Sequence, residues 1–213
     1  MNRLIALLIP FIIAAAAAES SRTAAEADPA SLSQHWAASL KAEEAKKYDE
    51  ALAETAAFQK AGGDVFMSTL RTAWLSLSSG DYTKAEASYT AASKLQPAAV
   101  NPLLGQLSTA QAQKDARKIE RAAEAVLRVE SANYRAQMAL GALYFAIPDY
   151  RKSLSAYRRV LTNYPDDNDA MSGAAWAAVY VGDKKEATEI FRRLLSMNPD
   201  YPQAKKGLEA AAK

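Results

Sequence analysis

A short motif recurs along this chain at multiples of thirty-four residues. The tripeptide Gly-Asp-Tyr at 80–82 reappears as Pro-Asp-Tyr at 148–150, two steps later, and as Gly-Asp-Lys at 182–184, one step further. Prolines recur in a common register as well, at Pro97, Pro165 and Pro199. Periods of this size are typical of stacked helical hairpins, each too small to bury its apolar face alone. The period therefore predicts a repeat architecture.

The register divides the chain into repeat units and terminal segments. We expect five units, of which the first is the weakest match: 32–65, 66–99, 100–133, 134–167 and 168–201. Residues 19–31 are expected to be a linker. Residues 202–213 are short and carry a single large apolar residue, Leu208, which favours a polar capping helix at the end of an open stack.

Apolar residues within a unit follow helical spacing. In 134–167, Leu140 and Tyr144 share one face of a first helix, and Tyr157 and Leu161 share one face of a second. Residues four apart are neighbours on a helix surface. No stretch alternates with the period of two residues that a half-buried strand requires. The sequence therefore predicts an all-α chain.

Aspartates mark the start of several predicted second helices. Asp81, Asp149 and Asp183 each follow a predicted break between two helices. The side-chain oxygens of aspartate accept hydrogen bonds from the free N–H groups of a first helical turn. We interpret these residues as helix caps rather than as catalytic acids or calcium ligands.

These positions resemble those of the tetratricopeptide repeat (TPR) family, whose units are helix-turn-helix pairs of this length. The unit 134–167 carries the family's pattern of large, small and aromatic residues with a final proline: Leu140, Gly141, Tyr144, Tyr150, Ser153, Tyr157 and Pro165. The resemblance implies a right-handed α-solenoid of stacked TPR repeats with a C-terminal capping helix. The unit 100–133 departs from the pattern, because Leu107 and Ile119 replace small residues where the two helices cross. We expect that hairpin to be splayed or shifted.

The N-terminus has the pattern of a secretory signal peptide. Arg3 precedes an apolar run, and the small residues Ala16 and Ala18 suit cleavage after Ala18. The run from Leu4 to Ala18 has fifteen residues, fewer than the roughly 20 that a membrane span needs. We therefore expect residues 1–18 to be removed and the mature protein to be periplasmic or secreted. An uncleaved membrane anchor is the alternative.

Composition excludes several kinds of site. The chain has no cysteine and a single histidine, His35, so it cannot assemble a thiolate or multi-histidine zinc site. The pair Gly62-Gly63 lacks the Lys-Ser or Lys-Thr continuation of a phosphate-binding loop. With 26 basic and 24 acidic residues, the charge does not favour nucleic acid. We predict a protein that is not an enzyme and has no cofactor and no metal.

The tryptophans indicate where a partner binds. In the TPR family, positions 2, 5, 9 and 12 of each unit line a concave groove, and position 9 is usually polar. Here Trp74 and Trp176 occupy position 9. The predicted groove is apolar and largely aromatic, and its proposed partner-binding residues are Trp36, Leu70, Trp74, Leu77, Met138, Phe145, Trp176 and Tyr180.

An apolar groove of this kind fits an amphipathic helix or an extended apolar segment, anchored by the tryptophans. We therefore expect a scaffold or adaptor for an envelope assembly. The same residues leave three alternatives open: a carrier or sensor of an apolar small molecule, self-association of the chain, and cover of the groove by residues 19–31. The basic pairs Arg158-Arg159 and Arg192-Arg193 are expected on the outer side, as a solvated face or as a site for an anionic partner.

Overall fold

The computed structural model describes residues 28–212 of the chain. The predicted signal peptide, 1–18, and most of the predicted linker lie outside the described residues. Residues 28–212 form eleven helices and no strand, which confirms the all-α prediction. The helices are α1 (Pro29–Glu44), α2 (Tyr48–Lys60), α3 (Val65–Ser79), α4 (Tyr82–Leu95), α5 (Val100–Ala112), α6 (Ala116–Val129), α7 (Tyr134–Ala146), α8 (Tyr150–Asn163), α9 (Asn168–Val181), α10 (Lys184–Met197) and α11 (Pro202–Ala212).

Helix α1 begins earlier than the sequence analysis placed the first repeat. Asp28 accepts hydrogen bonds from the backbone N–H groups of Ala30 and Ser31, at 3.1 and 3.2 Å, and Pro29 occupies the first turn. Both features favour a helix start, since proline has no N–H that the first turn would leave unsatisfied. Residues 29–31 therefore belong to the helix and not to the linker.

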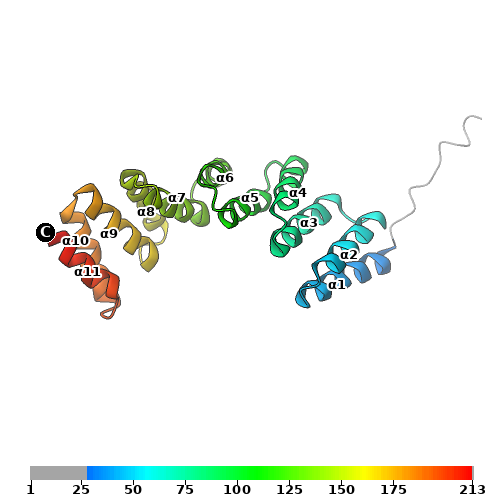
Figure 1. Cartoon of the computed structure of the whole chain (residues 1–213), viewed down its shortest axis with the longest axis horizontal. Helices are drawn as coiled ribbons and strands as arrows, with labels where there is room; N and C mark the ends of the chain where they lie inside the picture. Colours follow the sequence, from blue (N-terminus) through cyan, green and yellow to red (C-terminus); the bar gives the residue numbers. More distant parts are fainter. Residues whose placement is uncertain (1–27, 213) are drawn as a thin grey trace, which may run out of the picture. The chain divides into compact units, whose positions relative to one another are not determined.

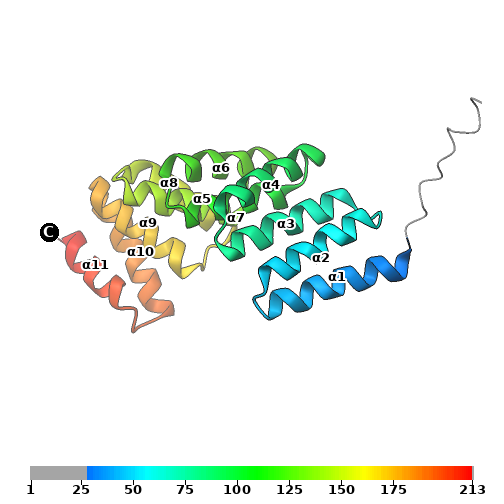
Figure 2. The same cartoon turned by 45° about the vertical axis from the view of Figure 1, so that its right-hand side comes forward.

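The chain consists of two compact units, one up to Ser68 and one from Thr69 onward. In the first unit, α1 and α2 lie side by side as a helical hairpin (Figures 1 and 2). Their contact is polar as well as apolar, because the buried Ser39 hydroxyl lies 3.0 Å from the Ala51 carbonyl oxygen and 2.9 Å from the Thr55 hydroxyl. A small residue at this crossing lets the helix backbones approach closely.

In the second unit, each helix from α4 to α11 packs against the next one in the chain. The first helices of successive hairpins also contact one another in the order α5, α7, α9, α11. This arrangement is a stack of hairpins in which the first helices form one row (Figure 1). No helix within residues 28–212 has both the length and the apolar character needed to cross a membrane.

Most hairpin turns share one geometry. From α4 onward, the residue before the second helix of a hairpin is an aspartate whose side chain accepts a hydrogen bond from the third helical N–H: Asp81, Asp115, Asp149 and Asp183. Helix α2 differs, because Lys47 precedes it and makes no such bond. The predicted capping roles are thus confirmed. The residue before the aspartate is left-handed in several turns: Gly80 (φ 88°), Lys114 (φ 55°) and Gly182 (φ 90°). Glycine adopts this conformation without the Cβ clash that other residues incur.

Close approach between successive repeats depends on a second set of glycines. A Cβ on Gly105 would lie only 2.0 Å from the Tyr89 ring, and one on Gly207 would lie 2.1 Å from the Phe191 ring. The Tyr157 ring likewise blocks a Cβ on Gly173. Gly105, Gly173 and Gly207 share one repeat register. An aromatic residue on a second helix therefore packs directly onto the backbone of the following first helix.

The unit 100–133 accommodates its two large residues. Leu107 is 1% exposed and lies in a cluster with Ala123, against which Ile119 packs. Helices α5 and α6 still pack against each other, so the predicted splaying is not found at Leu107. Other units carry an aromatic residue in the register of Ala123, such as Tyr89 and Tyr157. The small Ala123 side chain leaves the volume that Leu107 and Ile119 fill.

Candidate functional site

Four aromatic side chains from α7, α8 and α9 meet in the second unit. The Tyr150 and Tyr180 rings are stacked, with centroids 4.5 Å apart and planes 18° from parallel. Phe145 meets both rings nearly edge-on, at 5.5 and 5.7 Å. The Trp176 centroid is 6.3 Å from that of Tyr180. We name Phe145, Tyr150, Trp176 and Tyr180 the aromatic cluster.

The helix geometry explains why these rings meet. Trp176 and Tyr180 are four residues apart on α9, so they share one face of that helix. Phe145 lies in the last turn of α7, and Tyr150 is the first residue of α8. Helix α7 packs against both α8 and α9. Phe145, at its C-terminal end, therefore contacts Tyr150 of α8 and Tyr180 of α9.

Exposure differs strongly within the aromatic cluster. Tyr180 is 54% exposed, although it is a large aromatic residue. Trp176 is only partly exposed, because its indole packs edge-on against the fully buried Phe191 at 5.6 Å. Met138 also packs against the buried cluster that contains Phe191. Trp176 is thus partly covered by Phe191, and Tyr180 is the most exposed ring of the aromatic cluster.

A second apolar stripe lies on α3. Trp74 is 49% exposed, and Leu70 and Leu77, four residues before it and three after it, are partly buried. The two leucines pack against a cluster of Ala73, Ala85 and Tyr89. These residues share one face of α3, whereas the aromatic cluster is built from α7, α8 and α9.

Trp36 belongs to the first compact unit. Its ring packs against Phe58 of α2 at 5.1 Å with an interplanar angle of 55°, and the side chain is partly exposed. Such aromatic pairs stabilise a hairpin beyond the area they bury. The structure therefore gives Trp36 a packing role between α1 and α2.

Sequence reasoning missed Tyr150 as a member of the aromatic surface. The repeat pattern identified it as a packing residue between helices, and it contacts Phe145 in that way. Its stacking on Tyr180 joins residues thirty positions apart, a contact that a single-helix pattern cannot specify. The recurrence of tyrosine at 82 and 150 in the thirty-four-residue register was the available signal.

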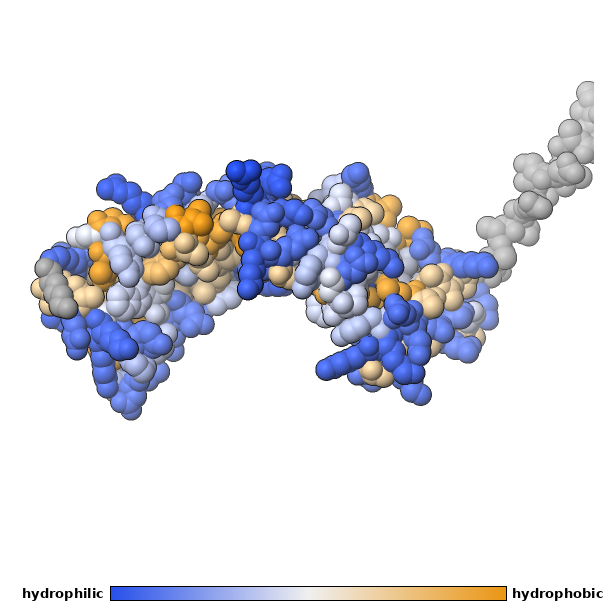
Figure 3. Space-filling model, viewed as in Figure 1, coloured by the Kyte–Doolittle hydropathy of each residue, from blue (hydrophilic) through white to orange (hydrophobic). Residues whose placement is uncertain are grey.

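On the face seen in Figure 3, apolar patches are separated by hydrophilic side chains. One arginine of each basic pair forms an ion pair. Arg158 Nε donates to Glu186 Oε1 at 2.7 Å, and Arg193 pairs with Asp166 at 2.7 Å. These ion pairs support the interpretation of a solvated face, which acidic residues of the same unit already neutralise.

No group of three or more histidine, aspartate or glutamate residues within 28–212 is arranged to hold a metal ion. His35 Nδ1 lies 2.7 Å from Glu54 Oε2, between α1 and α2. This contact joins the two helices of the first hairpin and occupies the ring nitrogen that faces α2.

Residues 107–170 match the model of the tetratricopeptide repeat family. These residues therefore carry tetratricopeptide (TPR) repeats. Helix content and the order of hairpins are those of the family's solenoid. No curated protein matches the sequence.

Solved structures resemble this chain over most of its length. A tetratricopeptide repeat protein from Parabacteroides merdae has a TM-score of 0.70 at 18% identity, covering 85% of this chain and 72% of its own. MamA from Desulfovibrio magneticus has a TM-score of 0.68 at 17% identity, with 83% and 99% coverage. YrrB, described as a TPR protein with an unusual peptide-binding site, has a TM-score of 0.64 at 12% identity, with 80% and 88% coverage.

At these identities the similarity shows the fold and not a shared ligand. The TPR fold itself indicates a scaffold for protein–protein interaction, and proteins of this family are generally non-enzymatic. The aromatic cluster and the apolar stripe on α3 are therefore candidate contact surfaces for another polypeptide.

Proposed function

We propose that this chain is a non-enzymatic scaffold that binds an apolar helix or an extended apolar segment of a partner protein. The observation that carries the proposal is the aromatic cluster, in which a tyrosine that is 54% exposed is stacked on a second tyrosine and flanked by Phe145 and Trp176. Rings held by one another present a rigid surface, which loses little side-chain entropy on binding.

The energetics favour a partner at this position. Aromatic residues dominate interface hot spots, because each buries a large area in a preformed setting. Covering about 100 Å² of exposed tyrosine surface contributes roughly 2.5 kcal/mol, at about 25 cal/mol per Å². The α3 stripe, with Trp74 flanked by Leu70 and Leu77, is a second surface of the same chemistry.

We further propose that the scaffold acts in the cell envelope, as a periplasmic or secreted component of an assembly there. Support comes from the sequence of residues 1–18, whose charge, apolar run and small residues fit an export signal. Peptide binding by the structurally similar YrrB supports a polypeptide partner rather than a small molecule.

The test replaces Tyr180 by a photo-crosslinking phenylalanine analogue in the full chain, expressed in its native cells. We expect one partner to crosslink after irradiation and to be lost when the cluster is cut back by Phe145→Ala. Tyr164, which is 48% exposed on the C-terminal side of α8, carries the analogue in the matched control. Circular dichroism checks that the helices persist.

Three outcomes are decisive. A partner captured at 180 and not at 164 supports the scaffold. A crosslink only between copies of the chain replaces the heterologous partner by self-association. Equal capture at both positions removes the aromatic cluster as the binding site. A Trp74→Ala variant in the same experiment shows whether the α3 stripe contributes to the same partner.

A further inference from the structure

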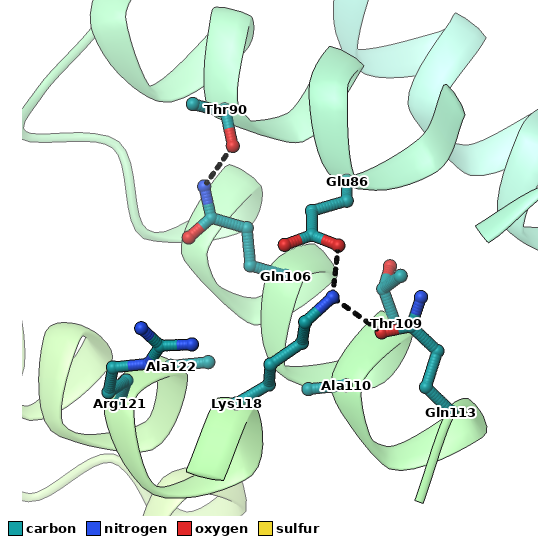
Figure 4. A pocket seen from close by; sticks show the side chains of 9 residues that line it. All are labelled: Glu86, Thr90, Gln106, Thr109, Ala110, Gln113, Lys118, Arg121 and Ala122. Carbon is teal, nitrogen blue, oxygen red and sulfur yellow. Dashed lines mark hydrogen bonds and ion pairs between the residues drawn. The ribbon is translucent and has the colours of Figure 1, made fainter. Parts of the chain in front are cut away.

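A separate cavity of about 240 Å³ lies between α4, α5 and α6. Ala110 of α5 lines it, together with Glu86, Gln106, Lys118 and Arg121 (Figure 4). The lining therefore combines polar and charged groups with a small apolar side chain. No residue of the aromatic cluster lines this cavity.

Comparison with the next repeat shows that the cavity lacks an aromatic ring. The residues thirty-four positions after Glu86, Ala110 and Lys118 are Glu120, Tyr144 and Lys152. There the Tyr144 hydroxyl donates to Glu120 Oε1 at 2.7 Å, and Lys152 Nζ lies 4.9 Å from the centre of the ring.

Tyr144 is 8% exposed in this setting, and its ring forms one wall of a further hollow of about 420 Å³. Burial first, and then the hydrogen bond to Glu120, raise the pKa of its hydroxyl. The phenol is therefore held as a neutral donor, between a carboxylate acceptor and an ammonium group.

Around Ala110, the corresponding carboxylate and ammonium groups, of Glu86 and Lys118, are present, but Ala110 provides no ring. Lys118 Nζ donates to Glu86 Oε2 at 2.6 Å and to Gln113 Oε1 at 3.1 Å (Figure 4). The Glu86 side chain is 45% exposed and that of Lys118 is 31% exposed. An ion pair this accessible contributes little to stability, so a ligand can share the carboxylate with Lys118.

The cavity also has the size of an aromatic ring. An apolar protein cavity of about 150 Å³ is known to hold benzene, and this one is larger. The Lys118 ammonium and the Arg121 guanidinium stand at its walls, where cations attract the face of a ring.

We propose that this cavity binds a phenol ring, seated on Ala110 with its hydroxyl donating to the Glu86 carboxylate. The ring belongs to a tyrosine side chain of a partner or to a free phenol. Tyr144, one repeat away, shows that the same frame of carboxylate and lysine accepts a phenol within this chain.

The test titrates the isotope-labelled full chain with p-cresol, toluene and N-acetyltyrosinamide, and follows backbone amide resonances by NMR. We expect saturable shifts at Gln106, Ala110 and Lys118 with p-cresol. Toluene is expected to bind about tenfold more weakly, because a hydrogen bond to a charged acceptor contributes about 1.4 kcal/mol or more. The Glu86→Gln variant is expected to lose most of this preference for p-cresol over toluene.

Filling the cavity from within gives the decisive variant. Ala110→Tyr should abolish p-cresol binding, whereas Ala112→Tyr, at an exposed position of the same helix, should leave it intact. If Ala110→Tyr fails to fold, Ala110→Leu replaces it as the blocking variant. Binding of N-acetyltyrosinamide at least as tight as that of p-cresol assigns the site to a tyrosine side chain, and binding of p-cresol alone assigns it to a free phenol. Equal binding of toluene and p-cresol, or shifts that persist in both blocking variants, overturns the proposal.

Discussion

At the scale of single residues, the burial of tyrosine hydroxyls predicts a loss of stability at alkaline pH. Tyr89 is 3% exposed, and burial raises its pKa from 10.0 to about 12. The neutral hydroxyl is therefore favoured in the folded state, and the stability it contributes is complete below pH 10 and lost between pH 10 and 12. Each such group changes the unfolding free energy by about 1.4 kcal/mol per pH unit in this range.

The prediction is that Tyr89→Phe makes the loss of stability above pH 10 less steep by about this amount. Urea unfolding, followed by circular dichroism at pH 9 to 11.5, measures the slope. Tyr180→Phe, on a side chain that is 54% exposed, is the matched control and should keep the slope of the unaltered chain. Identical slopes in all three proteins would contradict the prediction.

A second prediction at this scale concerns Gly105, whose absent Cβ makes room for the Tyr89 ring. Gly105→Ala should lower the unfolding free energy by about 1–3 kcal/mol through overpacking, although alanine favours a helix by about 1 kcal/mol. Gln111→Ala, at an exposed position of α5, is the control and should have almost no effect. If the clash is the cause, shortening the ring in Gly105→Ala/Tyr89→Leu gives a loss smaller than the sum of the two single changes. A stabilised Gly105→Ala protein would contradict this account.

At the scale of elements, the residue with a positive φ in a hairpin turn affects the free energy of unfolding, because a Cβ there is unfavourable. Lys114 adopts φ 55° where Gly80 and Gly182 provide glycine, and a residue with a Cβ incurs about 1–2 kcal/mol there. Lys114→Gly should therefore raise the unfolding free energy by about 0.5–1 kcal/mol, after the larger entropy of glycine in the unfolded chain is subtracted. Lys114→Ala keeps the Cβ and should give no gain. A loss of stability in Lys114→Gly, measured by urea unfolding, would contradict the expectation.

Elements are also the scale at which sequence predicted most. The period of thirty-four residues and the aspartate caps predicted where helices start, since both are local signals that recur. They could not predict the depth of each side chain. Trp74 and Trp176 occupy the same position of their repeats, but Trp176 is covered by Phe191 whereas Trp74 is 49% exposed. That difference arises from contacts between helices, which a pattern along one helix does not contain.

The unit 100–133 also shows that a pattern along one helix does not contain the contacts between helices. Leu107 and Ile119 depart from the family pattern, and a splayed or shifted hairpin was expected from them. The structure compensates with Ala123, a small residue where other repeats carry an aromatic ring. A core tolerates exchanges of size when the total volume is kept. Predicting the outcome required the three residues to be considered together, across two helices.

At the scale of the whole molecule, α11 covers apolar side chains of α10 in the second compact unit. Phe191 and Leu194 of α10 are fully buried, and the buried Gly207 of α11 lies directly against the Phe191 ring. A stack of repeats needs an outer face that is polar. With α11 deleted, two large apolar side chains of α10 would lie at an open end.

Deletion of residues 202–213 should therefore lower the unfolding free energy by about 2–5 kcal/mol, comparable to losing a buried aromatic contact, and should make the chain associate through its exposed end. Urea unfolding measures the first effect, and sedimentation velocity across a dilution series measures the second. Deletion of Lys213 alone is the control and should change neither. Introducing Phe191→Ala into the shortened chain should reverse the association, because the apolar side chain that drives it is gone. A shortened chain that stays monomeric and equally stable would show that α10 closes the stack without α11.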